Sequence, residues 1–260
     1  MALLNEITEK RRALDAARPL PQGIVHKLAD WFELELTVAG ARVEQSGLTR
    51  AEIVHVLDKG AVLRNRPPND QRLVLNHVDA LRVVARLSYE PQGVVTERTI
   101  TALHAVLYQG IDSGAGAYRE GALEDGAAAT PDPAKVRVSM SALSGWLRRT
   151  EPGPESAFEA HVRMAAVRPF YQGNAAVALL LTNLLLNRAG YPPVVVHAES
   201  VDVYRDTLER ARTMGDKSPF RETMMGLLEQ SLDVCLVAAA HGVVDRAAVD
   251  AGAADIGPDT

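Results

Sequence analysis

Residues 175–189 read AAVALLLTNLLLNRA, and this stretch decides the fold. Its valine and leucine side chains fall on every side of a helix, so no face is left wide enough for solvent. A helix of this kind is stable only inside a core. Gly190 and the pair Pro192-Pro193 then stop it. We therefore expect a central buried helix with the rest of the chain packed around it.

Helical periodicity recurs through most of the remaining sequence. Apolar residues three and four positions apart, with capping residues and glycines at the ends, predict further helices. The predicted ranges are 23–38, 48–57, 73–87, 96–110, 138–149, 156–167, 200–213 and 219–241. Alternation typical of strands is almost absent, apart from residues 135–138 and 194–196. The sequence predicts an all-α fold.

Composition limits the function classes. A chain of 260 residues with 47% hydrophobic residues can bury one sizeable core. A net charge of −5 argues against a general nucleic-acid binder, and the single Cys235 excludes an intrachain disulfide. The N-terminus does not read as a secretory signal, and the apolar stretch 175–186 is too short for a bilayer. We expect a cytoplasmic protein that contacts neither nucleic acid nor membrane.

Gly173-Asn174 directly before the central helix is the first candidate site. The first turn of a helix presents free backbone N–H groups and the positive end of the helix dipole, which together attract anions. Glycine allows close approach of a ligand, and asparagine can cap the helix. An ordinary cap and an anion site both fit this pair of residues. A long Gly-, Ala- and Asp-rich loop at 112–133 is also typical of segments that cover a site.

The neighbouring residues resemble a known family. The run Val167 to Asn174, VRPFYQGN, and the leucine-rich helix after it resemble the Fic signature His-Pro-Phe-x-Asp/Glu-Gly-Asn-Gly-Arg. Residues 160–161, 187–193, 116–119, 48–49 and 76–77 also look like family elements. The resemblance implies a Fic-like helical bundle at residues 20–243 with a short flap or hairpin and a possible homodimer. Residues 1–19 would be an N-terminal extension and 244–260 a flexible tail.

The resemblance also assigns roles to the motif. In the family the histidine is the base, the acidic residue holds Mg²⁺, and the final arginine binds the terminal phosphate. Here Arg168, Gln172 and Ala176 occupy those three places, and Ala175 replaces the second glycine. Arginine stays protonated and cannot be a base, and a neutral amide is a poor Mg²⁺ ligand. Standard AMP transfer is therefore expected to be lost, and nucleotide with Mg²⁺ is a disfavoured cofactor.

Three functions remain open. The first is a repurposed pocket that binds a small anionic ligand, carrying phosphate or carboxylate, with a reaction other than adenylylation. The second is a non-catalytic regulatory or partner-binding protein, and the third is a divergent but active protein adenylyltransferase or another nucleotidyl or phosphoryl transferase. The first function would use these residues as its anion site: Arg168, Phe170, Tyr171, Gln172, Gly173, Asn174, Ala175 and Ala176.

Further residues are candidates around this site. Glu44 is a regulatory candidate, because many Fic proteins carry an inhibitory glutamate; it could pair with Arg168 or simply be solvated. Tyr118 and Arg119 resemble the segment before the family's target-binding flap, although the protein target is not specified. His161 lies too far along its helix to replace the base and is expected to pack in the core. The scattered histidines predict no structural metal.

Overall fold

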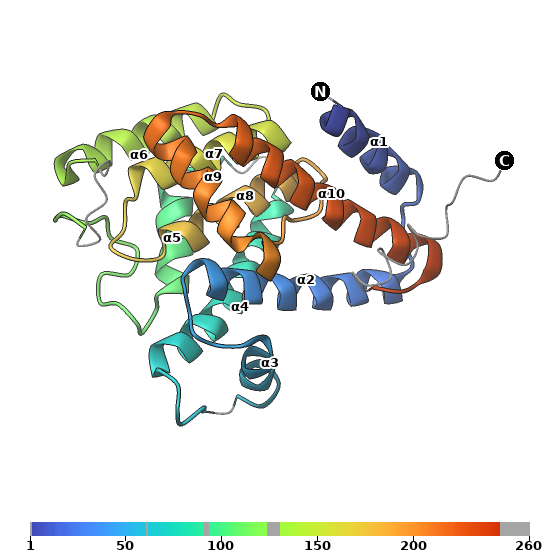
Figure 1. Ribbon diagram of the computed structural model, residues 1–260, viewed down its shortest axis with the longest axis horizontal. Coiled ribbons are helices and arrows are strands. Elements are labelled where there is room, and N and C mark those ends of the chain that lie inside the picture. The colour runs from blue at the N-terminus through green and yellow to red at the C-terminus, as the bar shows by residue number, and fades with distance from the viewer. Residues whose placement is uncertain (1, 61, 91–93, 124–130, 245–260) are drawn as a thin grey trace.

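The computed structural model describes residues 2–60, 62–90, 94–123 and 131–244. Within these ranges the protein is built from α-helices and one 3-10 turn, and no strand occurs among them. The all-α prediction is therefore confirmed. The elements, shown in Figure 1, are α1 (Ala2–Ala16), α2 (Gln22–Val43), α3 (Arg50–Lys59), α4 (Pro68–Ser88), α5 (Glu97–Leu107), α6 (Pro133–Leu147), α7 (Pro154–Val167), α8 (Asn174–Arg188), η1 (Ala198–Ser200), α9 (Val201–Met214) and α10 (Ser218–His241).

Helix α8 forms the centre of the bundle, as its apolar sequence requires. Its residues from Ala176 to Leu186 are all buried, and it packs against α2, α4, α5 and α7. The buried Asn183 side chain donates to the Val194 carbonyl at 3.2 Å and accepts from the Val194 N–H at 2.8 Å. This pairing satisfies a buried amide and anchors the segment after α8 against the core.

Helix α6 begins earlier than the sequence pattern predicts. Residues 135–138, which alternate like a strand, lie inside this helix. Pro133 occupies its first turn, where a missing N–H costs nothing, and the Asp132 carboxylate accepts from the Ala134 N–H at 2.9 Å. The capping residues Asp132 and Pro133 thus favour a helix here more strongly than the short alternating pattern favours a strand. The other strand-like stretch, 194–196, is buried but has no regular secondary structure.

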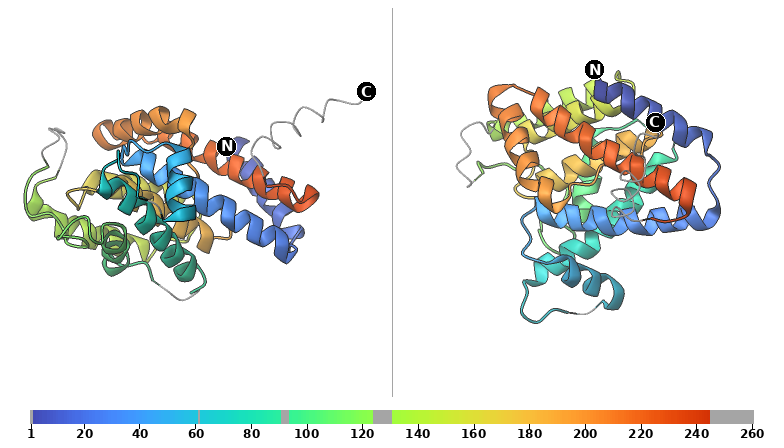
Figure 2. Two further views of the ribbon diagram at one scale, coloured as in Figure 1. Left: turned by 90° about the horizontal axis from the view of Figure 1, so that it is seen from below. Right: turned by 45° about the vertical axis from the view of Figure 1, so that its right-hand side comes forward.

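Most of residues 1–19, expected as an N-terminal extension, form helix α1, which runs beside α10 in both views (Figures 1 and 2). Ile7 and Leu14 are buried in the main core. Lys10 lies between the carboxylates of Glu229 and Asp233 on α10, at 2.8 and 2.7 Å. Of the expected tail 244–260, only Val244 lies within the described residues.

Helix α10 is long and apolar enough to cross a membrane by length and composition alone. In the protein it packs against α1, α2, α7 and α9, and half of its most apolar window is buried. Burial against neighbouring helices accounts for this composition, since core helices meet the same test.

Helix α3 and the end of α2 form a small second core, which projects from the bundle (Figure 2). Thr49 and Glu52 form a capping box that starts α3. The six residues of this second core are Val38, Ala41, Leu48, Ile53, Val56 and Val74. The chain between α2 and α3, residues 44–49, therefore leads from the end of α2, which contributes to both cores, into the second core.

One glycine on α2 is required by close packing. A Cβ added at Gly40 would overlap the ring of the buried His77 on α4. We expect Gly40→Ala to lower the free energy of unfolding by about 1–3 kcal/mol, because overpacking outweighs the gain in helix propensity. The matched control is Gly226→Ala on α10, where a Cβ meets nothing within 4 Å. Urea denaturation should show no loss for the control; equal stability of the two variants would contradict the prediction.

Candidate functional site

The turn between α7 and α8 is closed by its own side chain and backbone. Arg168 ends α7 in a left-handed conformation at φ +45°, and Gly173 caps α8 at φ +76°. Asn174, expected as a helix cap, instead binds both backbone groups of Phe170. Its Nδ2 donates to the Phe170 carbonyl at 2.8 Å, and its Oδ1 accepts the Phe170 N–H at 3.0 Å. The turn is therefore fixed before any partner binds.

The first turn of α8 holds a carboxylate. Gly173 N–H donates to Glu44 Oε2 at 3.2 Å, and Ala176 N–H donates to Glu44 Oε1 at 2.9 Å. The Tyr108 hydroxyl donates to Glu44 Oε2 at 3.2 Å. These contacts use the free N–H groups and positive dipole end that the sequence pattern indicated, so the helix start binds the internal Glu44 carboxylate mainly through main-chain donors.

Glu44 is thus bound in the site rather than solvated in a loop. It lies just after α2, and the next residue, Gln45, adopts a left-handed φ of +59°. Burial raises the pKa of the Glu44 carboxyl group, against the pull of the Ala176 N–H, the Tyr108 hydroxyl and the Gly173 N–H. The hydrogen bonds from the protein favour the charged carboxylate, but they do not fully offset its loss of hydration, so the pKa is raised.

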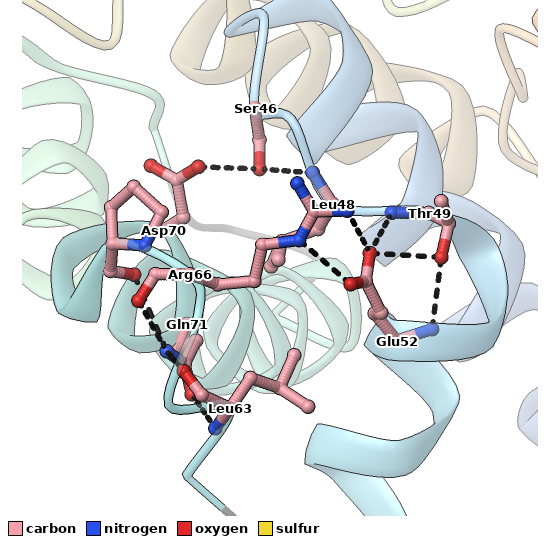
Figure 3. A network of polar contacts seen from close by, with 9 residues as sticks. Ser46, Leu48, Thr49, Glu52, Leu63, Arg66, Asp70 and Gln71 are labelled. Atoms are coloured by element: carbon pink, nitrogen blue, oxygen red, sulfur yellow. Dashed lines mark hydrogen bonds and ion pairs between the residues drawn. The ribbon is translucent and has the colours of Figure 1, made fainter.

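A network of hydrogen bonds holds the segment that follows Glu44 in the chain (Figure 3). Ser46 Oγ donates to Asp70 Oδ2 at 3.2 Å and accepts from the Leu48 N–H at 3.3 Å. Farther along, the Arg66 guanidinium donates to both oxygens of Glu52, at 2.7 and 3.0 Å. This Arg66 contact lowers the pKa of Glu52 to about 2. The position of Glu44 therefore depends on the packing of the α3 region.

Helix α5 supports the turn with two stacked rings. His104 stacks on Phe170 with ring centroids 3.8 Å apart and on Tyr108 with centroids 4.9 Å apart. Phe170 itself is fully buried, so it belongs to the floor of the site and does not line the cavity. The Tyr108 ring covers Gly173 so closely that a Cβ at this position would overlap it.

Arg119, predicted beside a flap, is buried and structural. Its Nε donates to the Arg168 carbonyl at 2.8 Å, and its two terminal nitrogens donate to the Gly121 and Pro131 carbonyls at 3.0 and 2.6 Å. Its own N–H donates to the Pro169 carbonyl at 2.8 Å. The guanidinium thus binds the motif to the loop, of which residues 124–130, where the flap or hairpin was expected, lie outside the described residues.

The two tyrosines near the site also have defined contacts. The exposed Tyr171 accepts at its hydroxyl oxygen from the N–H groups of Glu120 and Gly121, at 3.3 and 2.8 Å. The Tyr118 hydroxyl donates to Glu97 at 3.0 Å. Tyr171 therefore holds the start of the loop at the cavity wall, whereas Tyr118 packs toward α5.

A cavity of about 960 Å³ opens in front of the α8 start. It is lined by the end of α2, the start of α4, the segment just after α5, the end of α7, the motif turn and α9. Arg168, Tyr171, Gln172, Gly173, Asn174 and Ala175 line it, together with Glu44. Ala176 is fully buried and contributes its backbone N–H. The structure therefore groups most of the predicted site residues around one space.

The sequence prediction missed residues that lie far from the motif along the chain. Arg205 and Arg212 on α9 line the same cavity. Arg212 pairs with Glu209 at 2.6 Å, and Arg205 donates to the Arg42 carbonyl at 2.7 Å. His104 and Tyr108 were also missed, although their spacing of four residues places them on one face of a predicted helix. Only the fold shows that this face meets the motif.

His161 packs in the core, as expected. It is fully buried, with Nδ1 3.0 Å from the Thr182 hydroxyl and Nε2 2.9 Å from the Tyr204 hydroxyl. Burial lowers its pKa to about 3. Because Thr182 donates to the Ala178 carbonyl, it accepts from His161, which leaves His161 Nε2 to accept from Tyr204. This chain of hydrogen bonds connects α7, α8 and α9.

The comparisons with known proteins confirm the family resemblance. Residues 94–186 match the model of the Fic/DOC family. Two similar relatives are named "Protein adenylyltransferase Fic". The one from Culex quinquefasciatus is 23% identical over 88% of this chain and 47% of its own length. The one from Aedes aegypti is 27% identical over 68% of this chain and 37% of its own length. The chain thus spans about half or less of these relatives.

Solved structures share the fold. A Fic domain-containing signaling protein from Bacteroides thetaiotaomicron superposes with a TM-score of 0.83 at 23% identity, covering 92% of this chain and all of that protein. A fragment of Fic-1 from C. elegans gives a TM-score of 0.82 at 21% identity, over 93% of this chain and 74% of the fragment. The expected Fic-like bundle is confirmed.

The relatives correct the function expected first. A pocket repurposed for a small anionic ligand, with AMP transfer lost, is overturned by relatives that are named protein adenylyltransferases. That expectation depended on the side chains of Arg168, Gln172 and Ala176. The anion site in the structure is made of backbone N–H groups, which substitutions of these side chains leave in place.

The raised pKa of Glu44 gives a pH dependence of known sign. The native state binds the Glu44 proton more tightly than the unfolded state does. The contribution of this proton to the free energy of unfolding is therefore complete below pH 4.5, and it is lost as pH rises through the pKa of Glu44 in the native state. We expect the stability of the wild-type protein, relative to Glu44→Gln, to fall as pH rises. Chemical denaturation of both proteins at several pH values measures this difference.

Glu52 provides a control with the opposite sign. Its pKa is lowered to about 2, so its contribution is present above pH 4.5 and is lost as pH falls toward 2. The wild-type protein should therefore lose stability relative to Glu52→Gln as the solution is acidified. If the Glu44 difference profile had the same slope as the Glu52 profile, the assignment would be refuted.

Proposed function

We propose that this chain, with its Fic/DOC region at residues 94–186, is a divergent nucleotidyl transferase that acts on a protein hydroxyl group. In this reaction the hydroxyl oxygen bonds to the α-phosphorus of a nucleoside triphosphate. The bond from that phosphorus to the β-phosphate oxygen breaks, pyrophosphate leaves, and the hydroxyl proton passes to water. The names of the relatives support the transferase class, and the site described above supports the binding of phosphate.

The observation that carries the proposal is the way in which the Glu44 carboxylate is bound. Its two oxygens receive N–H groups from Gly173 and Ala176 at one helix start. A phosphate group presents oxygens of the same charge and similar spacing, so the donors that bind the carboxylate are also suited to phosphate. A nucleotide phosphate and Glu44 would compete for the same N–H groups, and Glu44 has to leave first.

The cavity supports a ligand of nucleotide size. Its volume of about 960 Å³ lies at the upper end of the range for small-molecule sites. Asp70, Asp206 and Glu209 also line the cavity, and Arg168 and Arg205 are side chains in it that can pair with phosphate oxygens. Leu73, Ile111 and Leu208 give it an apolar part that suits a nucleobase. Both features are expected of a pocket for a phosphorylated, partly aromatic ligand.

A protein-held Mg²⁺ does not fit the residues present. Within the described part of the chain, no group of three or more His, Cys, Asp and Glu side chains is arranged to hold a metal. Gln172 offers a neutral amide oxygen, which is a weaker ligand for a hard cation than a carboxylate. Glu209 at the cavity wall is paired with Arg212. We derive no step of the reaction through a metal.

Arg168 would contribute charge rather than proton transfer. A guanidinium group has hydrogen-bond donors and no acceptor, so it cannot accept the proton of the attacking hydroxyl. Placed at the cavity wall, it can offset the charge that develops on the phosphate oxygens. We therefore expect slow transfer, because general base catalysis commonly contributes a factor of about 10² to 10⁴.

Removing the internal carboxylate should open the site. We expect Glu44→Ala to bind ATP at least about tenfold more tightly than the wild-type protein, because the amide donors no longer have a competing partner. Isothermal titration calorimetry with ATP measures the change. Glu209→Ala, which removes another cavity carboxylate away from the α8 start, controls for a general loss of negative charge and should bind less tightly than Glu44→Ala.

Transfer is tested on the same variant. ATP labelled at its α-phosphate should leave the label on protein when it is incubated with Glu44→Ala and a cell extract. Binding without labelling would reject the transferase and favour a non-catalytic regulatory protein. Absence of ATP binding to Glu44→Ala, with the fold intact by circular dichroism, would reject the phosphate site itself.

A further inference from the structure

His104 meets the motif turn through two hydrogen bonds whose directions are determined. Its Nε2 lies 3.2 Å from the Gln172 carbonyl oxygen, which can only accept. Its Nδ1 lies 2.8 Å from the Gly116 N–H, which can only donate. The ring must therefore carry its proton on Nε2 and be neutral. Burial lowers its pKa to about 4, which is consistent with a neutral ring.

The bond to Gln172 acts on the anion site through one peptide plane. The Gln172 carbonyl and the Gly173 N–H belong to the same peptide unit, and a trans peptide directs them to opposite sides. His104 holds the carbonyl from one side at 3.2 Å, and Glu44 Oε2 accepts the N–H on the other side at 3.2 Å. Rotation of this peptide away from His104 would also turn the N–H away from the anion.

We infer that His104 is a positioning residue for the anion site, because it fixes the peptide plane that aims the Gly173 N–H at the bound oxyanion. The inference deepens the proposed function and rests on it for the identity of the oxyanion. His104 lies outside the cavity lining, so it contacts no ligand and acts through Gln172 and Gly173.

The surroundings make this role specific. His104 is almost fully buried and stacks within 2° of parallel on Phe170, which prevents the ring from tilting. Tyr108, the C-cap residue at the end of α5, also stacks on His104 and donates its hydroxyl proton to Glu44. Helix α5 thus supplies one direct donor to the anion and one residue that orients a second donor.

Two substitutions separate the two hydrogen bonds. The amide of a glutamine reaches the position of Nε2, so His104→Gln keeps a donor for the Gln172 carbonyl. The amide of an asparagine reaches the position of Nδ1, so His104→Asn keeps an acceptor for Gly116 and loses the bond to Gln172. Both variants lose the ring stacking, so each serves as the control for the other.

The affinity for inorganic pyrophosphate is measured by calorimetry in a Glu44→Ala background. We expect His104→Asn to weaken binding by about tenfold and His104→Gln to retain affinity within about threefold. Retention by glutamine is the rescue that a purely structural role would not give, since both changes remove the ring. Equal affinities of the two variants would overturn the inference. If the parent Glu44→Ala does not bind pyrophosphate, the proposed phosphate site fails instead.

A second measurement tests the inference without a ligand and without comparing the affinities of the variants. The ¹⁵N shifts of the His104 ring in the wild-type protein report which nitrogen carries the proton. We expect the Nε2–H tautomer, and the Gly173 amide proton shift should indicate a hydrogen bond that is weakened in His104→Asn. Observation of the Nδ1–H tautomer or of a doubly protonated ring at neutral pH would overturn the inference even if both variants failed to fold.

Discussion

The free N–H groups in the first turn of a helix cannot be satisfied by the helix itself, so a buried helix start needs an outside acceptor. In this protein α8 is the most buried helix, and Glu44 supplies that acceptor from 129 residues away in the sequence. Much of the site follows from this requirement. Helix α2 has to end just before Glu44, and residues 44–49 have to cross from the main bundle to the α3 region.

The same requirement explains why the Glu44 carboxylate is bound mainly through main-chain donors. The donors are backbone groups whose directions depend on Gly173, on the Asn174 contacts with Phe170 and on α5. Side chains can change around such a site without removing it. For this reason the replacement of three motif side chains gives a poor measure of whether the main-chain site is retained.

The sequence predicted the fold well where one segment carries its own signal. The all-round apolar pattern of α8 specified its burial, and the turn after Val167 was located within a residue. The start of α6 was missed because Asp132 and Pro133 were counted with the loop. The partner of the α8 start could not be predicted from periodicity, because Glu44 looks like any polar residue after a helix. His104 looked like one of several scattered histidines for the same reason: its role depends on which helix faces Gln172.

Arg119 brings together the two ends of a segment that lies between α5 and α6. One guanidinium holds the carbonyls of Gly121 and Pro131 while it also binds the Arg168 carbonyl. Insertions or deletions between residues 121 and 131 would therefore leave the two ends of the segment attached to Arg119 and, through it, to the motif. The length and composition of this segment can therefore change without rebuilding the floor of the pocket.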